Sequence, residues 1–318
     1  MKVLFTAPHG FLSYPVRTRY DELGTRFLEA WYPEELDDKH DEITWVTNPG
    51  QHFVVDDAIL DRFPRLELVS TPSTGTNHLD LEACANRGIR VFSLLDDRNA
   101  LEGISASAEY TFLMLLNGLR RLDLGMQEVR EGRWRSREDR LRGRELQGKT
   151  VGLVGLGRIG RKLAAYCRPF GCDVLYYDPY VTPPADGSPA RVPELEALWE
   201  GSDVIVICCQ LTVETRSMIR GDLIERARLG ALIVNTSRGE IVDENELCDV
   251  LRRRDDLTFC ADVVTGEVED RHEDSPLMDL FRSGRIVLTP HIAGATTESQ
   301  EKAAVITLHL LESEARRW

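Results

Sequence analysis

The chain has 318 residues, of which 42% are hydrophobic, and carries a formal net charge of −14 at pH 7. This length predicts two domains, and no apolar run reaches the roughly 20 residues that span a bilayer. The acidic balance argues against nucleic acid and anionic membranes as partners, because phosphate binding needs a basic surface. Seven scattered cysteines without a C-x-x-C pair predict reduced thiols, and the N-terminus lacks a secretory signal pattern, so we expect a cytoplasmic protein. The histidines show no metal-ligand spacing, so we expect no metal site.

The first part of the chain predicts a small α/β unit. The expected elements are, in order, strand 2–6, strand 43–47, helix 56–62, strand 66–70, helix 79–87 and strand 90–93. A long helix follows over 105–122. The segment 120–144 is rich in arginine, and we expect it to be a solvated or subunit-facing arm.

An apolar strand then runs into GLGRIG, with the G-x-G-x-x-G spacing at Gly155, Gly157 and Gly160. The first glycine permits a tight turn, the second lets a pyrophosphate approach the backbone, and the third lets helix and strand pack closely. The amides that open the following helix, 161–170, would face the phosphates. Asp178 ends the next strand, where a carboxylate can bind both ribose hydroxyls and repel a 2′-phosphate. This arrangement predicts an NAD site and favours NAD over NADP.

Strands and helices continue to alternate to the end of the chain. The expected elements are helix 193–200, strand 203–209, helix 221–227, strand 231–235, helix 244–253, strand 258–263, strand 285–288 and helix 297–316. Such alternation predicts parallel sheets with helices on both faces.

Four further segments carry polar residues near expected strand ends: STGTNHLD (73–80), NTSRGEIVD (235–243), DVVTGE (262–267) and LTPHIAGAT (288–296). Arg238 follows a strand at the carboxyl edge of the sheet, where its guanidinium could hold a substrate carboxylate. The ordinary alternative is a salt-bridged surface arginine. His291 lies in a turn after Pro290, and an imidazole can exchange a proton with a hydroxyl near neutral pH. A lone histidine is more often structural.

Together with GLGRIG and the preceding ELQGK (145–149), these segments resemble the D-isomer-specific 2-hydroxyacid dehydrogenase family, in register from Leu66 to Thr296. The family includes phosphoglycerate, glycerate, lactate and formate dehydrogenases. The resemblance implies two Rossmann-like, doubly wound parallel-sheet domains. An NAD-binding domain, 101–284, would be inserted into a flavodoxin-like substrate domain made of 1–100 and 285–318. It also implies an oxidoreductase that acts on D-2-hydroxy or 2-oxo acids such as phosphoglycerate, glycerate or hydroxypyruvate. A homodimer through helix 105–122 and the arginine-rich arm is implied as well.

The resemblance further assigns roles to individual residues. The catalytic set would be Arg238, Glu267 and His291, in which Glu267 orients the imidazole. The amides of Ser73, Thr74 and Gly75, together with Arg238, would hold the substrate carboxylate. The implied cofactor contacts are Gly155, Gly157, Arg158, Ile159, Gly160, Asp178, Cys208, Thr212, Thr236 and Asp262. At residues 208–212 the chain reads CCQLT, where the family usually has H-x-P-L-T.

Two rival functions are weighed against the dehydrogenase interpretation. An NADH-sensing regulatory protein, similar to corepressors of the same family, would keep the catalytic residues but act by binding partners. A formate dehydrogenase is disfavoured because such enzymes place an amide where this chain has Glu267.

Overall fold

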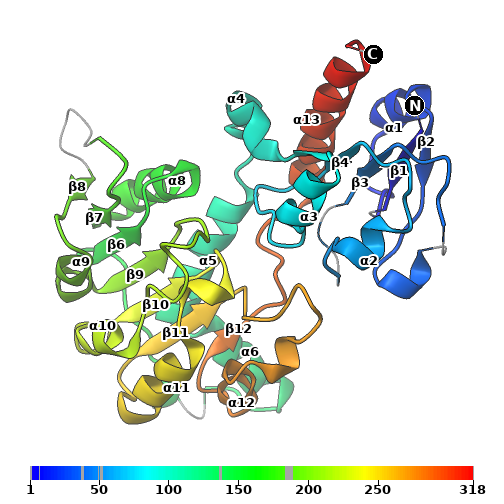
Figure 1. Ribbon diagram of the computed structural model, residues 1–318. Helices are drawn as coiled ribbons and strands as arrows, with labels where there is room; N and C mark the ends of the chain where they lie inside the picture. The colour runs from blue at the N-terminus through cyan, green and yellow to red at the C-terminus, as the bar shows by residue number, and fades with distance from the viewer. Residues whose placement is uncertain are drawn as a thin grey trace. The chain divides into compact units, whose positions relative to one another are not determined.

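The chain forms two compact units, shown in the computed structural model of Figure 1, which describes residues 2–317 except 7, 37–38, 49, 51–52, 136–137 and 183–188. The first unit contains 1–104, 266–272 and 295–318, and the second contains 105–265 and 273–294. Because both chain ends belong to the first unit, the second is an insertion in it.

The ends of these units differ from the predicted domain ranges. Residues 285–294 lie in the second unit, whereas the prediction placed them in the first. The reason is strand β12 (Val287–Leu288), which pairs with β11 (Thr258–Ala261) of the larger sheet. Residues 101–104 and 266–272 lie with the first unit.

A five-stranded parallel sheet forms the first unit, in the order β2-β1-β3-β4-β5. This order is the flavodoxin-like one, as predicted. Its strands are β1 (Val3–Phe5), β2 (Thr25–Phe27), β3 (Trp45–Thr47), β4 (Leu68–Ser70) and β5 (Arg90–Phe92). Its helices are α1 (Tyr14–Glu22), α2 (Asp57–Leu60), α3 (Leu81–Asn86), α4 (Arg98–Leu101) and α13 (Thr297–Ala315).

Alternating side chains divide the core of the first unit between the two faces of its sheet. On one face, Val3 and Phe5 pack with Leu308 and Leu311 of α13. The Tyr20 hydroxyl of α1 also donates to the Ala304 carbonyl of α13, at 2.8 Å. The C-terminal helix therefore completes the core that the first strand begins.

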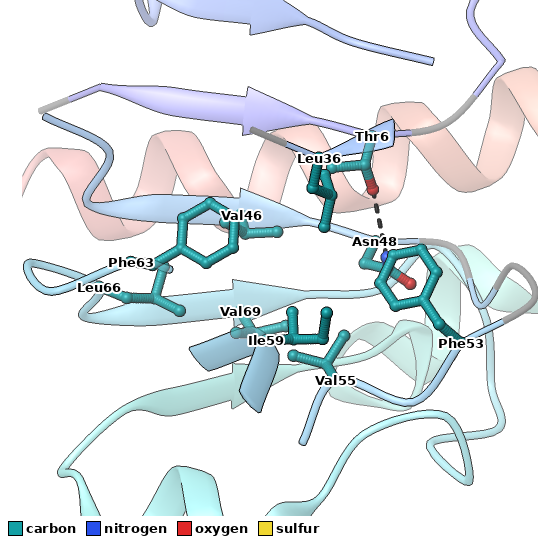
Figure 2. A pocket seen from close by; sticks show the side chains of 10 residues that line it. All are labelled: Thr6, Leu36, Val46, Asn48, Phe53, Val55, Ile59, Phe63, Leu66 and Val69. Atoms are coloured by element: carbon teal, nitrogen blue, oxygen red, sulfur yellow. Dashed lines mark hydrogen bonds between the residues drawn. The ribbon is translucent and has the colours of Figure 1, made fainter. Parts of the chain in front are cut away.

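The other face, which includes Leu4, encloses a small void (Figure 2). The lining is apolar except for Thr6 and Asn48, and the Asn48 side-chain amide donates to the Thr6 hydroxyl at 3.2 Å. With room for about 10 Å³, it is the size of a single water site and belongs to the core.

The second unit is a seven-stranded parallel sheet in the order β12-β11-β10-β9-β6-β7-β8. Besides β11 and β12, its strands are β6 (Thr150–Val154), β7 (Asp173–Tyr177), β8 (Ala190–Arg191), β9 (Val204–Ile207) and β10 (Leu232–Asn235). The strand order reverses between β6 and β9. In a sheet of this kind, ligands bind outside the carboxyl ends of the strands at that reversal.

Helices cover both faces of this sheet. The helices of this unit are α5 (Ala106–Arg120), α6 (Leu122–Arg130), α7 (Glu138–Leu141), α8 (Arg158–Cys167), α9 (Leu195–Gly201), α10 (Gly221–Glu225), α11 (Glu244–Arg253) and α12 (Leu277–Arg282). One apolar cluster joins α5 and α8 to the sheet. A second cluster joins α9, α10, α11 and α12 to it. The arginine-rich arm contains α6 and α7. No helix among the described residues is long and apolar enough to cross a membrane.

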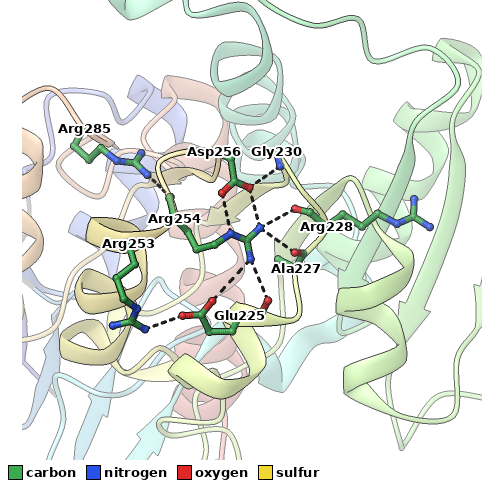
Figure 3. A network of polar contacts seen from close by, with 8 residues as sticks. All are labelled: Glu225, Ala227, Arg228, Gly230, Arg253, Arg254, Asp256 and Arg285. Atoms are coloured by element: carbon green, nitrogen blue, oxygen red, sulfur yellow. Dashed lines mark hydrogen bonds and ion pairs between the residues drawn. The ribbon is translucent and has the colours of Figure 1, made fainter.

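A polar network ties together the ends of α10 and α11 (Figure 3). Arg254 forms two hydrogen bonds of 2.8 Å with Asp256 and also donates to the carbonyls of Glu225 and Ala227. Asp256 accepts the Gly230 amide at 2.8 Å. One guanidinium thus satisfies carbonyls that the end of α10 leaves without helical partners.

Candidate functional site

The glycine turn lies at the carboxyl end of β6, at the strand reversal. Gly155 has φ +100°, and a Cβ there would lie 2.9 Å from the Cys209 backbone nitrogen. A Cβ on Gly160 would lie 2.5 Å from the Gly155 carbonyl oxygen. Both positions therefore need glycine for the turn itself, the first for its backbone angle and the other for helix packing.

Gly157 differs from Gly155 and Gly160 because a Cβ on Gly157 would meet no atom within 4 Å. This glycine is exposed and is the N-cap of α8, a ten-residue helix that opens with Arg158 and Ile159. Nothing in the described part of the protein requires a glycine at this position. Open space beside amides at a helix N-terminus is what a pyrophosphate needs.

Asp178 follows β7, and its carboxylate is fixed beside the same turn. One oxygen accepts the Leu156 amide and the other accepts the Tyr180 amide, each at 2.9 Å. Since a carboxylate offers about four acceptor positions, two stay available for hydroxyls. The side chain is half-buried, so these positions can be reached by a ligand.

Cys208 and Thr212 follow β9, on the other side of the reversal. The Cys208 thiol lies beside the glycine turn, with its Sγ 3.6 Å from the Gly155 oxygen, and burial raises its pKa. Thr212 is exposed and forms a local turn in which its amide donates to the Thr215 hydroxyl at 2.8 Å. Of these two predicted cofactor residues, Cys208 is thus the one that contacts the glycine turn, whereas Thr212 bonds within its own loop.

Arg238 lies in the turn after β10 and is half-buried. Asn235 holds this turn from both sides: its Oδ1 accepts the Ser237 amide and its Nδ2 donates to the Arg238 carbonyl, both at 3.0 Å. The Arg238 guanidinium donates to the Ser237 carbonyl at 2.7 Å. A Cβ on Gly239 would lie 2.2 Å from the Val264 carbonyl carbon, so the turn packs tightly against the segment after β11.

Thr236, a predicted cofactor residue in the same turn, is tied to helix α5. Its hydroxyl lies 2.6 Å from the Thr111 hydroxyl. Sequence reasoning did not single out Thr111. The available signal was a polar β-branched residue within the apolar run of a helix.

His291 follows β12 and is exposed, with a left-handed backbone (φ +51°). Its amide donates to the Asp262 carbonyl at 2.8 Å. Asp262 is fully buried, and its carboxylate accepts the Thr289 hydroxyl and the amides of Ile292 and Ala293. Burial raises the pKa of Asp262, while these hydrogen bonds and His291 oppose the rise. The contact of Asp262 with a cofactor carboxamide stays a prediction.

The remaining predicted residues lie in the first unit. In the turn after β4, the Ser73 hydroxyl donates to the Gly75 carbonyl at 2.5 Å, and the Ser73 carbonyl accepts the Leu94 amide at 3.0 Å. Thr74 lies between them and, like them, is half-buried. Glu267 is half-buried in the segment 266–272. Its pairing with His291, which lies in the other unit, stays a prediction.

Three of the predicted groups thus lie on the second unit, all at carboxyl ends of its strands: the glycine turn with Asp178, the Arg238 turn and the His291 turn. Among the described residues, no group of three or more His, Cys, Asp or Glu side chains could hold a metal ion. The fold of this unit and its glycine turn are those of a dinucleotide-binding domain.

Comparison with known proteins gives the family. The model of the NAD-binding domain of D-isomer-specific 2-hydroxyacid dehydrogenases matches residues 112–293, more than half of the chain. The chain therefore belongs to this family of NAD-dependent dehydrogenases, as its sequence motifs predicted.

Two curated relatives and one solved structure are similar over most of their length. Glyoxylate/hydroxypyruvate reductase HPR3 of Arabidopsis thaliana is 32% identical over 81% of this chain and 76% of its own. The (S)-sulfolactate dehydrogenase of Chromohalobacter salexigens is 35% identical over 80% of this chain and 79% of its own. The crystal structure of the TT0316 protein from Thermus thermophilus has a TM-score of 0.81 and 30% identity, covering 98% of this chain and 97% of that one.

The similar D-3-phosphoglycerate dehydrogenases are longer proteins. The Archaeoglobus fulgidus enzyme is 32% identical over 79% of this chain, but the match covers only 46% of that enzyme. This chain therefore spans about half the length of such relatives.

Proposed function

We propose that this protein transfers a hydride between NAD and a D-2-hydroxy acid or 2-oxo acid pair, with hydroxypyruvate/glycerate and phosphoglycerate as the first candidates. The observation that carries the proposal is that the Arg238 and His291 turns lie at the carboxyl edge of the sheet whose reversal carries the open glycine turn. A carboxylate anchor and a proton carrier on that edge are the two groups that oxidation of a 2-hydroxy acid requires.

In the proposed reaction, His291 takes the proton from the substrate hydroxyl, and NAD, when bound, would supply the acceptor for the C2 hydride. In the reverse direction His291 returns the proton to the developing alkoxide. Arg238, with the amides of Ser73–Gly75, binds the carboxylate and fixes which face of C2 meets the cofactor. Glu267 orients the imidazole and stabilises its protonated form, as an acid does in a hydrolase triad. The hydride chemistry itself is supplied by the bound NAD.

The test is NADH oxidation with a panel of 2-oxo acids: hydroxypyruvate, glyoxylate, pyruvate, 3-phosphohydroxypyruvate and sulfopyruvate. We expect turnover on at least one. His291→Ala should then lower kcat by about 100-fold or more, since general acid–base catalysis contributes that much. NADH affinity, measured by fluorescence titration, should stay nearly unchanged. NADH binding without turnover on any acid would instead favour the NADH-sensing regulatory protein.

We also propose that the protein is a homodimer and that it is cytoplasmic. The dimer is supported by an apolar stripe on α6, where the exposed residues Leu122, Met126 and Val129 recur at helical spacing. Met126→Asp with Val129→Lys should convert a dimer into a monomer in sedimentation experiments. Leu229→Asp, at an 87% exposed residue outside the arm, is the control that should leave the dimer intact. A wild-type protein that sediments as a monomer would contradict the proposed dimer.

A further inference from the structure

Two adjacent residues of helix α5 contact the turns that carry Arg238 and His291. Thr111 meets Thr236, hydroxyl to hydroxyl, at 2.6 Å. The hydroxyl of the preceding residue, Tyr110, lies close to the Thr289 side chain, two residues before His291, and this proximity opposes the rise that burial causes in the pKa of Tyr110. Successive residues on a helix point about 100° apart, so one turn of α5 can reach two separate loops.

Thr289, which lies close to Tyr110, is bonded to Asp262, the residue that holds the His291 turn. The Asp262 carboxylate accepts the Thr289 hydroxyl at 2.6 Å and the amides of Ile292 and Ala293 at 3.0 and 2.7 Å. The backbone carbonyl of Asp262 accepts the His291 amide at 2.8 Å. Every one of these donors belongs to the His291 turn. A row of hydroxyls thus links α5 to a buried carboxylate that binds this turn along its length.

The His291 turn needs such support because its backbone is strained. A left-handed conformation, as at His291, is unfavourable for a residue other than glycine and persists only where surrounding contacts enforce it. Asp262 is fully buried, so removing one of its hydrogen-bond donors would leave a carboxylate oxygen without a partner and away from water, which is unfavourable. The His291 turn would then lower its free energy by changing its conformation.

Helix α5 is itself held at a fixed distance from the sheet. It packs on β10 and β11, and a Cβ on Gly118 would lie 2.6 Å from Leu232 Cδ1 and 2.8 Å from Cys260 Sγ. Such close contact leaves little freedom for the helix to shift relative to the strands that precede the two turns. Its polar side chains can therefore act as fixed supports.

We propose that Tyr110 and Thr111 are positioning residues, and that α5 sets the geometry of the two reactive side chains together. Tyr110 acts on His291 through Thr289 and Asp262, and Thr111 acts on Arg238 through Thr236. The proposal rests on the proposed function for its kinetic consequences, but the structural relation can be tested without turnover.

Kinetics separate the two supports. Thr289→Val should lower kcat roughly 3- to 10-fold with little change in KM, as expected for loss of a hydrogen bond worth about 1 kcal/mol. Tyr110→Phe, which removes the hydroxyl close to Thr289, should change kcat in the same direction. Thr289→Ser keeps the hydroxyl and should restore wild-type kcat. Thr111→Val should instead raise the KM for the 2-oxo acid by a similar factor, and Thr111→Ser should reverse this rise.

The matched control is Thr307→Val in α13. Thr307 is as buried as Thr111 and donates to a carbonyl of its own helix at 3.0 Å, as Thr111 does at 2.6 Å, but its bond stays within α13. It should leave both kinetic constants unchanged. Equal effects from Thr111→Val and Thr307→Val would overturn the role of Thr111.

NMR provides a readout that does not need activity. The His291 ring resonances, assigned by comparison with His291→Ala, should move in Thr289→Val and Tyr110→Phe and return in Thr289→Ser. Unchanged His291 resonances in both variants would overturn the role of Tyr110. A wild-type protein inactive on every 2-oxo acid, with resonances that move as described, would refute the proposed reaction and leave the positioning role standing.

Discussion

Replacing Arg254 by methionine should destabilise the second unit strongly. The guanidinium forms two charge-assisted bonds of 2.8 Å to Asp256 and donates to the Glu225 and Ala227 carbonyls at 3.0 and 3.1 Å. The side chains of Arg254 and Asp256 are only 21% and 20% exposed. Breaking a buried ion pair costs about 3–5 kcal/mol. With some discount for solvent screening, we expect a loss of about 3 kcal/mol in the free energy of unfolding.

This loss should depend on pH in a defined direction. Arg254 holds the pKa of Asp256 well below its ordinary value. A carboxyl whose pKa is lower in the folded state stabilises the fold above its unfolded pKa, which is about 3.9. That contribution is lost as the pH falls toward the folded pKa. The difference between wild type and Arg254→Met should therefore be largest near pH 7 and shrink below about pH 4.

The assay is urea unfolding followed by circular dichroism at a series of pH values, with Arg252→Met as the control. Arg252 lies in the last turn of α11, two residues before Arg254, and pairs with Asp249, but both side chains are more than half exposed. An exposed pair is worth under about 1 kcal/mol, so this variant should resemble wild type. If the two variants lose equal stability, or if the loss from Arg254→Met is the same at pH 3 and pH 7, the reasoning is refuted.

Three further outcomes are expected. Gly157→Val should weaken NADH binding, measured by fluorescence titration, at nearly unchanged thermal stability, whereas Gly160→Ala should lower the melting temperature; the opposite pattern would contradict the assigned use of the open space. Asp178→Ala should narrow the preference for NADH over NADPH in kcat/KM, because the variant lacks the carboxylate that repels a 2′-phosphate; an unchanged ratio would count against that role. Burial raises the pKa of Cys167 to about 12 and of Cys248 to about 11, so iodoacetamide at pH 8 should spare both in the folded protein and alkylate them in urea. Rapid modification of the folded protein, detected by mass spectrometry, would show that these thiols are accessible.

The sequence was sufficient where a pattern is local. The glycine turn and its flanking strands are confirmed at β6 and β7, because glycine spacing and an apolar run of this kind have few structural solutions. The parallel sheets followed from the alternation of elements.

Helix α1 and strand β2 were not predicted. The helix has the sequence YPVRTRYDE, with only two buried side chains, and the strand is a three-residue edge with no fully buried residue. Neither offers the apolar periodicity on which prediction depends. Tertiary contacts decide such segments, as the Tyr20 bond to α13 illustrates.

The supports of the candidate site also could not be predicted. Asp262 was expected to contact the cofactor, and its support of the His291 turn was not foreseen. The three groups that donate to its carboxylate belong to residues 27 to 31 positions later in the chain. Tyr110 and Thr111 lie more than 120 residues from the turns that they contact. No sequence spacing reveals such pairs, because they depend on how close α5 packs on β10 and β11.

The last helix has a consequence for biosynthesis. Leu308 and Leu311 of α13 complete the core on the face of the sheet that includes Val3 and Phe5, so this face of the first unit stays incomplete until the ribosome has made α13. Nearly all of the inserted unit has emerged by then. Domains usually fold from the N-terminus onward during synthesis. In this chain we expect the inserted unit to fold before the α13 face of the first unit is complete, so that Val3 and Phe5 stay partly exposed in the meantime.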